Sequence, residues 1–112
     1  MKRSRVIETA VKIDGWQDTD ELGWLYDRAG ELSRGSTWVE VGCWKGRSFF
    51  ATAMGLAPGC FIYGVDTWMG SPESVSHWEA EFPTPWVRSH FNLCINLVNS
   101  LRRGDDVTAF SL

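Results

Sequence analysis

The sequence predicts an α/β fold built around a parallel β-sheet. Within residues 36–65, a strand, a glycine turn, a helix and a second strand follow one another, which is the order of a βαβ unit. Segments with helical spacing of apolar residues precede and follow this unit, and a third short strand comes last. With 112 residues, 44% of them hydrophobic and 22% charged, the chain has the size and composition of one globular domain.

The first predicted element is a helix over residues 20–33. Its apolar residues recur every three or four positions and form one face; they are Leu22, Leu25, Tyr26, Ala29 and Leu32. Asp18 followed by Glu21 is typical of a capping pair at a helix start, and Gly35 lies just beyond the predicted end.

The βαβ unit follows. Residues 36–41 are β-branched and aromatic and lie between Gly35 and Gly42, which predicts a strand. Residues 42–46 form a glycine-bracketed turn, residues 47–56 a buried helix, and residues 61–65 a second strand that ends at Asp66. Residues 48–65 carry no charge, a length that approaches a membrane span. Since Pro58 and Gly59 interrupt the stretch, we expect a helix and then a buried strand.

Three further elements are expected after Asp66. Ser71 and Pro72 predict the start of a short helix over residues 72–82. A longer helix is predicted for residues 86–103, with one apolar side facing the core: Val87, Phe91, Cys94, Leu97, Val98 and Leu101. Residues 107–110 are the third strand.

Charge and cysteine content exclude several classes of function. The net charge is −3, and the only basic cluster is in the first five residues, so electrostatic binding of nucleic acid is not expected. Charged residues follow that cluster where a signal peptide needs an apolar run. The three cysteines, without a Cys-x-x-Cys pair, predict reduced thiols in a cytoplasmic protein. His77 and His90 have no partner at metal-ligand spacing, so no metal is predicted.

The glycine turn is the feature that points to a ligand. Backbone amides and a helix N-terminus at such a turn favour an anionic or zwitterionic group. A phosphate-binding loop needs Gly-x-x-x-x-Gly-Lys-Ser/Thr, but the segment from Gly42 to Ser48 is one residue too short and has Arg in place of Lys. The dinucleotide fingerprint Gly-x-Gly-x-x-Gly fails because Trp44 and Arg47 occupy two of its glycine positions.

The remaining pattern, Glu-x-Gly-x-x-x-Gly in residues 40–46 with Asp66 twenty residues further on, resembles a known family. Residues 39–48 resemble the first motif of class I S-adenosylmethionine-dependent methyltransferases, in the branch whose turn reads Gly-x-Trp/Tyr-x-Gly-Arg-Ser. Gly15 and Trp16, the helix before the first strand, and residues 64–68 are also similar to that branch.

The resemblance implies a Rossmann-like parallel sheet with helices on both faces. The chain would be the N-terminal portion of such an enzyme, a single domain over residues 1–112, with a helical lead-in (1–35) and a Rossmann-like half (36–112). Its strands would lie in the order third, second, first. The remaining strands of the family sheet are missing, so the pocket is half built and no catalytic residue is named. The first strand would have an unpaired edge, from which we expect a homo-oligomer.

The resemblance also implies roles for individual residues, all of them toward S-adenosyl-L-methionine. The methionine part would be held by Glu40 and by the backbone of the turn, including Gly42, Cys43, Trp44 and Gly46. Ser48 would bond the cofactor carboxylate. The adenosine part would be bound by Asp66 at both ribose hydroxyls, with Thr67 and Trp68 lining it. The implied reaction is methyl transfer to an unidentified small-molecule acceptor.

Structural roles are the alternative for each of these residues. Gly42 and Gly46 would then only permit a tight turn, and Asp66 would be a helix-capping or solvent-facing acid. Tryptophan side chains are expected to serve packing rather than recognition; these are Trp16, Trp24, Trp38, Trp78 and Trp86. His77 and His90 are expected to be surface or satisfied histidines. For the whole chain, the alternatives are a non-enzymatic binding or assembly module that keeps the fold and, with less support, an NAD-type nucleotide binder.

Overall fold

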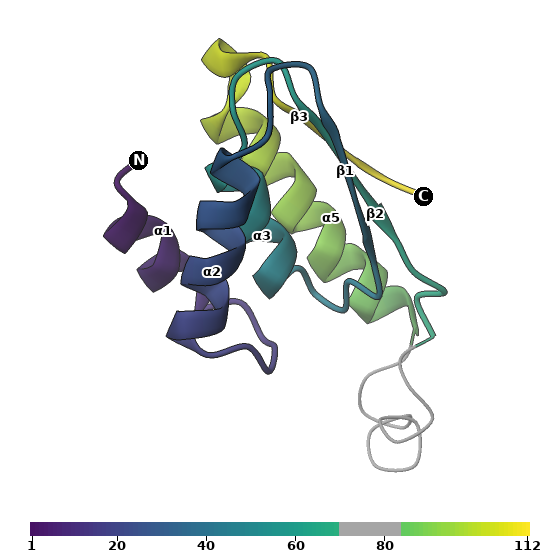
Figure 1. The fold of residues 1–112 in the computed structure, drawn as a ribbon. Coiled ribbons are helices and arrows are strands. Elements are labelled where there is room, and N and C mark those ends of the chain that lie inside the picture. Colours follow the sequence, from purple (N-terminus) through teal and green to yellow (C-terminus); the bar gives the residue numbers. More distant parts are fainter. Residues whose placement is uncertain (70–83) are drawn as a thin grey trace.

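The computed structural model of the protein describes residues 1–69 and 84–112 (Figure 1). Its elements, in chain order, are α1 (Arg3–Ala10), α2 (Thr19–Gly30), β1 (Thr37–Val41), α3 (Arg47–Gly55), β2 (Phe61–Val65), α5 (Thr84–Leu101), the short 3-10 helix η1 (Arg103–Asp105) and β3 (Thr108–Ser111). All three predicted strands and three of the predicted helices are confirmed. The helix predicted for residues 72–82 lies outside the described residues.

The sheet has three parallel strands in the order β1-β2-β3. Its register places Val39 beside Tyr63, and Tyr63 beside Phe110. This is the order third, second, first that the sequence analysis expects, and β2 is the central strand. Because the strands are parallel, their carboxyl ends meet at one edge of the sheet.

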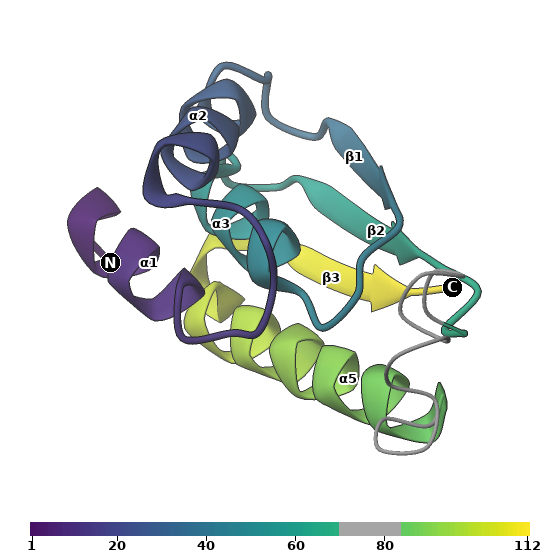
Figure 2. The same ribbon diagram turned by 90° about the horizontal axis from the view of Figure 1, so that it is seen from below.

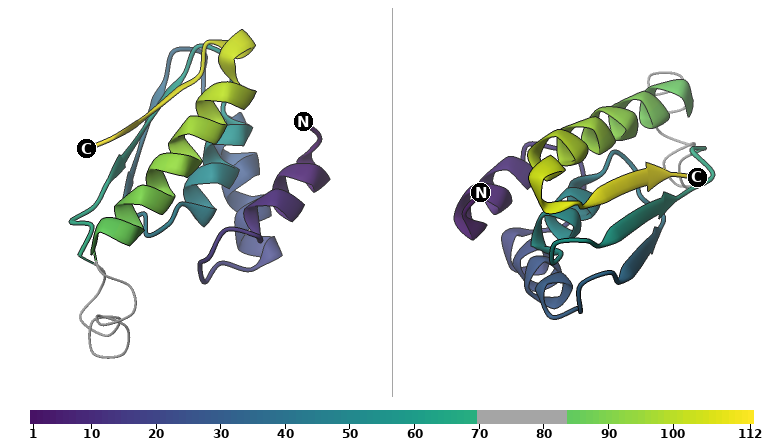
Figure 3. Two further views of the ribbon diagram at one scale, coloured as in Figure 1. Left: turned by 180° about the vertical axis from the view of Figure 1, so that it is seen from behind. Right: turned by 90° about the horizontal axis from the view of Figure 1, so that it is seen from above.

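The helices cover one face of the sheet only, so the expectation of helices on both faces is wrong for the described residues (Figures 2 and 3). The physical reason is that both crossovers, through α3 and through α5, advance across the sheet in the same direction. Right-handed crossovers in one direction place their helices on the same face. The other face exposes apolar side chains, among them Val39 (55% exposed), Val41 (78%), Phe61 (40%) and Phe110 (38%).

Helix α3 is the centre of the covered side. Every residue from Ser48 to Met54 is buried, and the helix packs against α1, α2 and α5. The uncharged stretch 48–65 is therefore a buried helix followed by a strand, as the sequence predicts. In the described part of the chain, no helix has the length and apolar character to cross a membrane.

The N-terminal third contains two helices, α1 and α2, whereas the sequence predicts only the second of them as a defined element. Helix α2 begins with the predicted capping box, since Asp18 Oδ1 accepts from the Glu21 amide at 2.8 Å and the Asp18 amide donates to Glu21 Oε1 at 3.2 Å. Helix α1 buries Val6, Ile7 and Ala10 against the other helices. Its basic residues obscure this short apolar face in the sequence.

The C-terminal end of α3 is held by a buried arginine. Arg102 is 7% exposed, and its guanidinium donates to the carbonyl oxygens of Ala53 (2.9 Å), Met54 (3.0 Å) and Leu56 (2.6 Å). It also pairs with Asp105 at 2.9 Å. The last carbonyls of a helix have no partner within the helix, so Arg102 satisfies groups that burial would otherwise leave without one.

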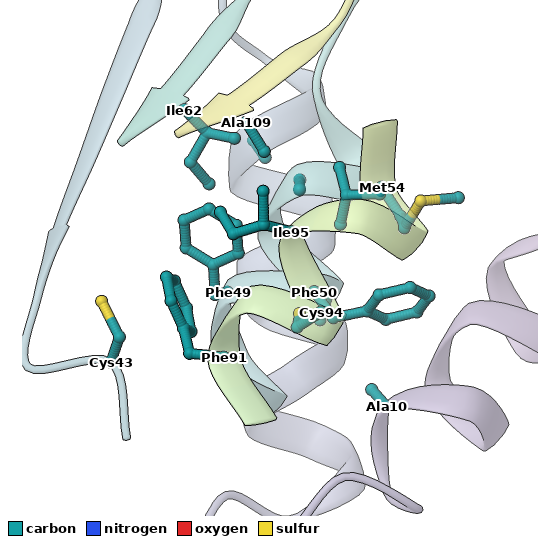
Figure 4. Close-up of a cluster of buried hydrophobic side chains, with 14 of the residues drawn as sticks. Ala10, Cys43, Phe49, Phe50, Met54, Ile62, Phe91, Cys94, Ile95 and Ala109 are labelled. Atoms are coloured by element: carbon teal, nitrogen blue, oxygen red, sulfur yellow. The ribbon is translucent and has the colours of Figure 1, made fainter. Parts of the chain in front are cut away.

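Helix α5 packs on α3 and on the sheet through Phe91 (Figure 4). The ring of Phe91 lies edge-on to Phe49 with 4.8 Å between centroids. A Cβ at Gly64 in β2 would collide with the Phe91 ring. The absence of a side chain at Gly64 therefore lets α5 approach the central strand.

We expect the substitution Arg102→Met to lower the free energy of unfolding by about 3 kcal/mol, because it leaves buried carbonyl oxygens without donors. The matched control is Arg103→Met at the exposed neighbouring position, for which a change below about 0.5 kcal/mol is expected. Urea unfolding followed by circular dichroism measures both. Equal, small losses in the two variants would contradict a capping role for Arg102.

Candidate functional site

The candidate site is the turn between β1 and α3, at the end of the sheet where the carboxyl ends of the strands meet. Three of its residues have a positive φ: Gly42 (82°), Trp44 (51°) and Gly46 (106°). A Cβ at Gly46 would lie 2.8 Å from Cys94 Sγ, so this glycine is needed both for the turn and for contact with α5. At Gly42, by contrast, no described atom beyond its two chain neighbours lies within 4 Å of the position a Cβ would take. The turn is therefore closed on its α5 side and open beside Gly42.

Asp66, directly after β2, ties this turn to the neighbouring strand. Its Oδ2 accepts from the amides of Cys43 (2.7 Å) and Trp44 (3.1 Å), and its Oδ1 accepts from the amide of Trp68 (3.0 Å). Burial alone would raise the pKa of Asp66, but these backbone hydrogen bonds outweigh it and hold the pKa below its ordinary value. Asp66 is thus an ionised carboxylate that joins turn amides, which differs from the helix-capping and solvent-facing roles given as its structural alternatives. Its predicted ribose contact stays a prediction.

Glu40 projects from β1 toward the helix-covered side of the sheet. Its Oε2 is buried and has no hydrogen-bond partner among the residues that the structure describes. Burial raises the pKa of Glu40 from 4.5 to about 7, although hydrogen bonds from Ser48 and Cys43 oppose the shift. A buried carboxyl oxygen without a donor is rare in folded proteins and requires an explanation.

Ser48 joins Glu40 to the start of α3. It is 8% exposed and lies close enough to the Glu40 carboxyl to lower the pKa of that group, and its carbonyl accepts from Thr52 Oγ1 at 2.9 Å. The helix begins after Gly46, which has no side chain to cap it. The first amides of α3 therefore point out of the helix without a side-chain cap from that position, beside the Glu40 carboxyl.

Thr67 and Trp68 differ in their exposure. Thr67 is exposed, and its Oγ1 accepts from the Met69 amide at 3.2 Å. Trp68 is only 4% exposed, its Nε1 donates to the Leu112 carbonyl at 3.1 Å, and its ring lies 4.9 Å from that of Phe91. The structure thus places Trp68 in the core, at the end of α5. The adenosine contacts predicted for both residues stay predictions.

The loop before α2, residues 11–17, is held against the turn by Arg47. The guanidinium of Arg47 donates to the carbonyl oxygens of Ile13 (2.6 Å), Gln17 (2.8 Å) and Val11 (2.9 Å). In the sequence, Arg47 is recognisable only as a motif position, and this role is not predicted. Gly15 belongs to the same contact, because a Cβ at this position would lie 2.9 Å from Arg47 Cβ. The arginine therefore fixes the loop as one wall of the site.

Two further contacts join the same loop to the turn. Lys45, whose side chain is 8% exposed, pairs with Asp14 at 3.1 Å. The rings of Trp44 and Trp16 lie 5.4 Å apart. Neither Lys45 nor Asp14 was singled out as a site residue from the sequence. Together they place a positive and a negative side chain beside the turn.

The packing role expected for the tryptophans is wrong for two of them. Trp16 is 71% exposed and Trp24 is 58% exposed, while Trp38 packs against the core as expected. Trp78 lies outside the described residues, and the side chain of Trp86 does likewise. The loop that carries Trp16 is held by hydrogen bonds from Arg47 to backbone carbonyls, so its position does not require burial of the Trp16 ring.

The three cysteines are buried and free, as expected for reduced thiols. Burial raises the pKa of Cys94 to about 12 and that of Cys43 still further, so both thiols stay protonated at neutral pH. His90 is exposed, as predicted, and His77 lies outside the described residues. Across residues 1–69 and 84–112, no group of three His, Cys, Asp or Glu side chains is placed to hold a metal ion.

The carboxyl ends of the strands therefore lie beside a buried acid with one oxygen that lacks a donor among the described residues, a helix start that Gly46 leaves uncapped, and an ionised carboxylate. An acid and a helix N-terminus side by side complement the two charges of a zwitterion. No protein-family model matches this sequence, and no curated protein sequence is similar to it.

We expect the stability of the protein to fall as pH rises from about 4.5 to 7, because of Glu40. The unfolded chain releases this proton near pH 4.5 and the folded chain near pH 7, so the unfolded state is favoured across that window. Relative to the Glu40→Gln variant, the wild type should lose about 3 kcal/mol between these limits.

Urea unfolding at about pH 4.5 and pH 8 measures this difference. The control variant is Glu8→Gln, since Glu8 is 65% exposed on α1. If wild type and Glu40→Gln keep a constant stability difference over this range, the pKa of Glu40 is not raised.

Proposed function

We propose that this chain binds S-adenosyl-L-methionine at the β1–α3 turn, as the cofactor-binding part of a class I methyltransferase that acts on a small-molecule acceptor. The observation that carries the proposal is the buried Glu40 carboxyl, whose Oε2 has no hydrogen-bond partner within residues 1–69 and 84–112. The motif resemblance of residues 39–48 selects this cofactor among zwitterionic ligands. A cytoplasmic location, where the buried thiols stay reduced, belongs to the same proposal.

The amino-acid end of the cofactor fits the two charges of the site. Its ammonium group carries three donors and would supply the hydrogen bond that Glu40 Oε2 lacks. A bound cation also favours the ionised form of Glu40 and so offsets the raised pKa. Its carboxylate would be received by the first amides of α3, near Ser48.

The nucleoside end would lie toward Asp66 and Gly42. The open space beside Gly42 leaves room for a ligand against the backbone. Ribose hydroxyls would share the Asp66 oxygens with the amides of Cys43, Trp44 and Trp68. An ionised carboxylate has about four acceptor positions, so the ribose would have to replace at least one of these contacts.

In the proposed reaction the cofactor supplies a methyl group carried on a sulfonium sulfur. The contribution of the described residues is alignment: Asp66 holds the turn in one conformation before any ligand binds, and Glu40 fixes the amino-acid end. Such preorganisation lowers the entropic cost of reaching a reactive geometry. The protonated thiols of Cys43 and Cys94 take no part as nucleophiles.

A second candidate function is a non-enzymatic binding or assembly module. It is favoured by Asp66, whose oxygens already have backbone donors without any ligand. In that case the turn is a closed structural feature and Asp66 has no ligand to hold. An NAD-type site has less support, because Trp44 and Arg47 stand where the dinucleotide fingerprint needs glycine.

The proposal is tested by calorimetric titration with two ligands, S-adenosylhomocysteine and 5′-methylthioadenosine, which has the same nucleoside but lacks the amino-acid end. Glu40→Gln should weaken S-adenosylhomocysteine at least tenfold, on the scale of a charge-assisted contact, and leave methylthioadenosine unchanged. Affinity of the wild type for S-adenosylhomocysteine should rise from pH 6 to pH 8 as Glu40 ionises.

The controls are Glu8→Gln, which should bind both ligands as the wild type does, and a titration with NAD, which should give no heat. Loss of both ligands in Glu40→Gln would mean a folding defect, which circular dichroism detects. Failure of the wild type to bind either ligand would favour the assembly module.

We also propose that the protein self-associates through the free edge of β1. No described strand pairs with this edge. The side chains of Val39 and Val41 in β1 lie on the adjoining open face of the sheet, where they are 55% and 78% exposed. The amides and carbonyls of alternate β1 residues that do not bond β2 point outward along the edge. Such an edge is a template for another strand, and a second copy offers the same apolar surface.

Val39→Lys should shift the protein toward the monomer, because a charged side chain at an edge strand opposes pairing. Sedimentation velocity at several concentrations measures the shift. Val11→Lys is the matched control, since Val11 is an exposed valine on the helical side, and it should associate as the wild type does. A wild type that stays monomeric at every concentration would overturn this part of the proposal.

A further inference from the structure

A cavity of about 410 Å³ lies between the loop that precedes α2 and the helix α5. Lys12, Ile13 and Asp14 line it from the loop, and His90, Leu93 and Leu97 line it from α5. Its volume falls within the range of small-molecule sites. It shares Lys45, Cys94 and the loop residues Ile13 and Asp14 with the surroundings of the glycine turn described above, and extends from there along α5.

The α5 wall is an apolar stripe at the protein surface. Its lining positions 90, 93, 94 and 97 are three or four residues apart and therefore share one face of the helix. Leu93 is 66% exposed and Leu97 is 39% exposed, although both are large apolar side chains. Ile13 on the loop is half-buried and faces the same cavity. The apolar part of a ligand in this cavity would therefore contact apolar side chains from the loop and from α5.

The charged groups at the cavity favour an anion. Among the described lining residues, Lys12 and Lys45 carry two positive charges against the single negative charge of Asp14. The Lys45 side chain is 8% exposed and pairs with Asp14 at 3.1 Å, so this positive charge is held in place at the cavity wall. Lys12 is exposed at the loop. An acidic group on a ligand would meet a net positive surface beside apolar walls.

The loop wall is fixed before a ligand binds. Arg47 bonds three carbonyl oxygens of residues 11–17, and Lys45 holds Asp14. A preformed wall avoids the ordering cost that weakens binding to mobile loops. The cavity is therefore a built feature of the fold rather than a gap between independent segments.

We propose that this cavity binds a small molecule that carries one acidic group on an apolar, aromatic or branched aliphatic body. The acid is recognised by the lysines, above all by Lys12 at the loop, and the body by Leu93, Leu97 and Ile13. The cavity adjoins the proposed cofactor site through Lys45 and the loop of residues 11–17, but binding in it needs no S-adenosylmethionine.

The test uses two fluorescent probes of nearly the same shape: 8-anilinonaphthalene-1-sulfonate, which is anionic, and N-phenyl-1-naphthylamine, which lacks the sulfonate. In the wild type we expect the anionic probe to bind at least tenfold more tightly. Lys12→Glu should remove this preference and leave the neutral probe unchanged. Leu97→Ser should weaken both probes. The two positions are exposed, so circular dichroism should report an unchanged fold.

The control variant is Val41→Ser on the open face of the sheet, the other exposed apolar surface described above. It should leave the affinity for both probes unchanged. The proposal is overturned if Val41→Ser abolishes the fluorescence while Leu97→Ser does not, because the probes then bind the sheet. It is also overturned if the two probes bind equally well, or if neither binds.

Discussion

The carboxylate of Asp66 is the constraint on which the site depends. By accepting from the amides of Cys43, Trp44 and Trp68, it joins the turn after β1 to the chain after β2. These bonds hold Trp44 at a φ of 51°, a conformation that costs energy for a side chain other than glycine. With the turn fixed, Gly46 lies against α5 and Glu40 beside the start of α3. A strained turn that is held without a ligand is what a preorganised binding site requires.

Two arginines connect the buried helix α3 to the rest of the molecule. Residues 48–54 of this helix carry no charge and are surrounded by other elements. Arg102 supplies donors to the carbonyl end, and Arg47, at the other end, uses its side chain to bind the loop that precedes α2. A central apolar helix therefore depends on charged residues placed just outside its apolar segment. The same two residues connect the helix to the N-terminal loop and to the β3 side of the molecule.

The sequence predicts those features that depend on local pattern, and fails where contacts are distant. The βαβ unit, the strand positions and the Asp18 capping box follow from residue types at short spacing. The strand order was implied by the family resemblance. The single covered face depends on the direction of two crossovers, and the exposure of Trp16 depends on a loop held by Arg47, 31 residues away. The sequence predicts Glu40 as a site residue from its place before the glycine turn. The lack of a described partner for its Oε2 depends on the three-dimensional packing.

The open face of the sheet affects how the protein responds to temperature. In most domains, unfolding transfers the apolar surface of both sheet faces to water, and this transfer gives unfolding its large positive heat-capacity change. Here Val39, Val41, Phe61 and Phe110 are already hydrated to a large extent in the folded state. The heat-capacity change of the single chain should therefore be smaller than the ~1.3–1.7 kcal/mol/K typical of a domain of this length. A smaller value flattens the curve of stability against temperature, so that the folded chain gains little from mild cooling and also resists cold denaturation.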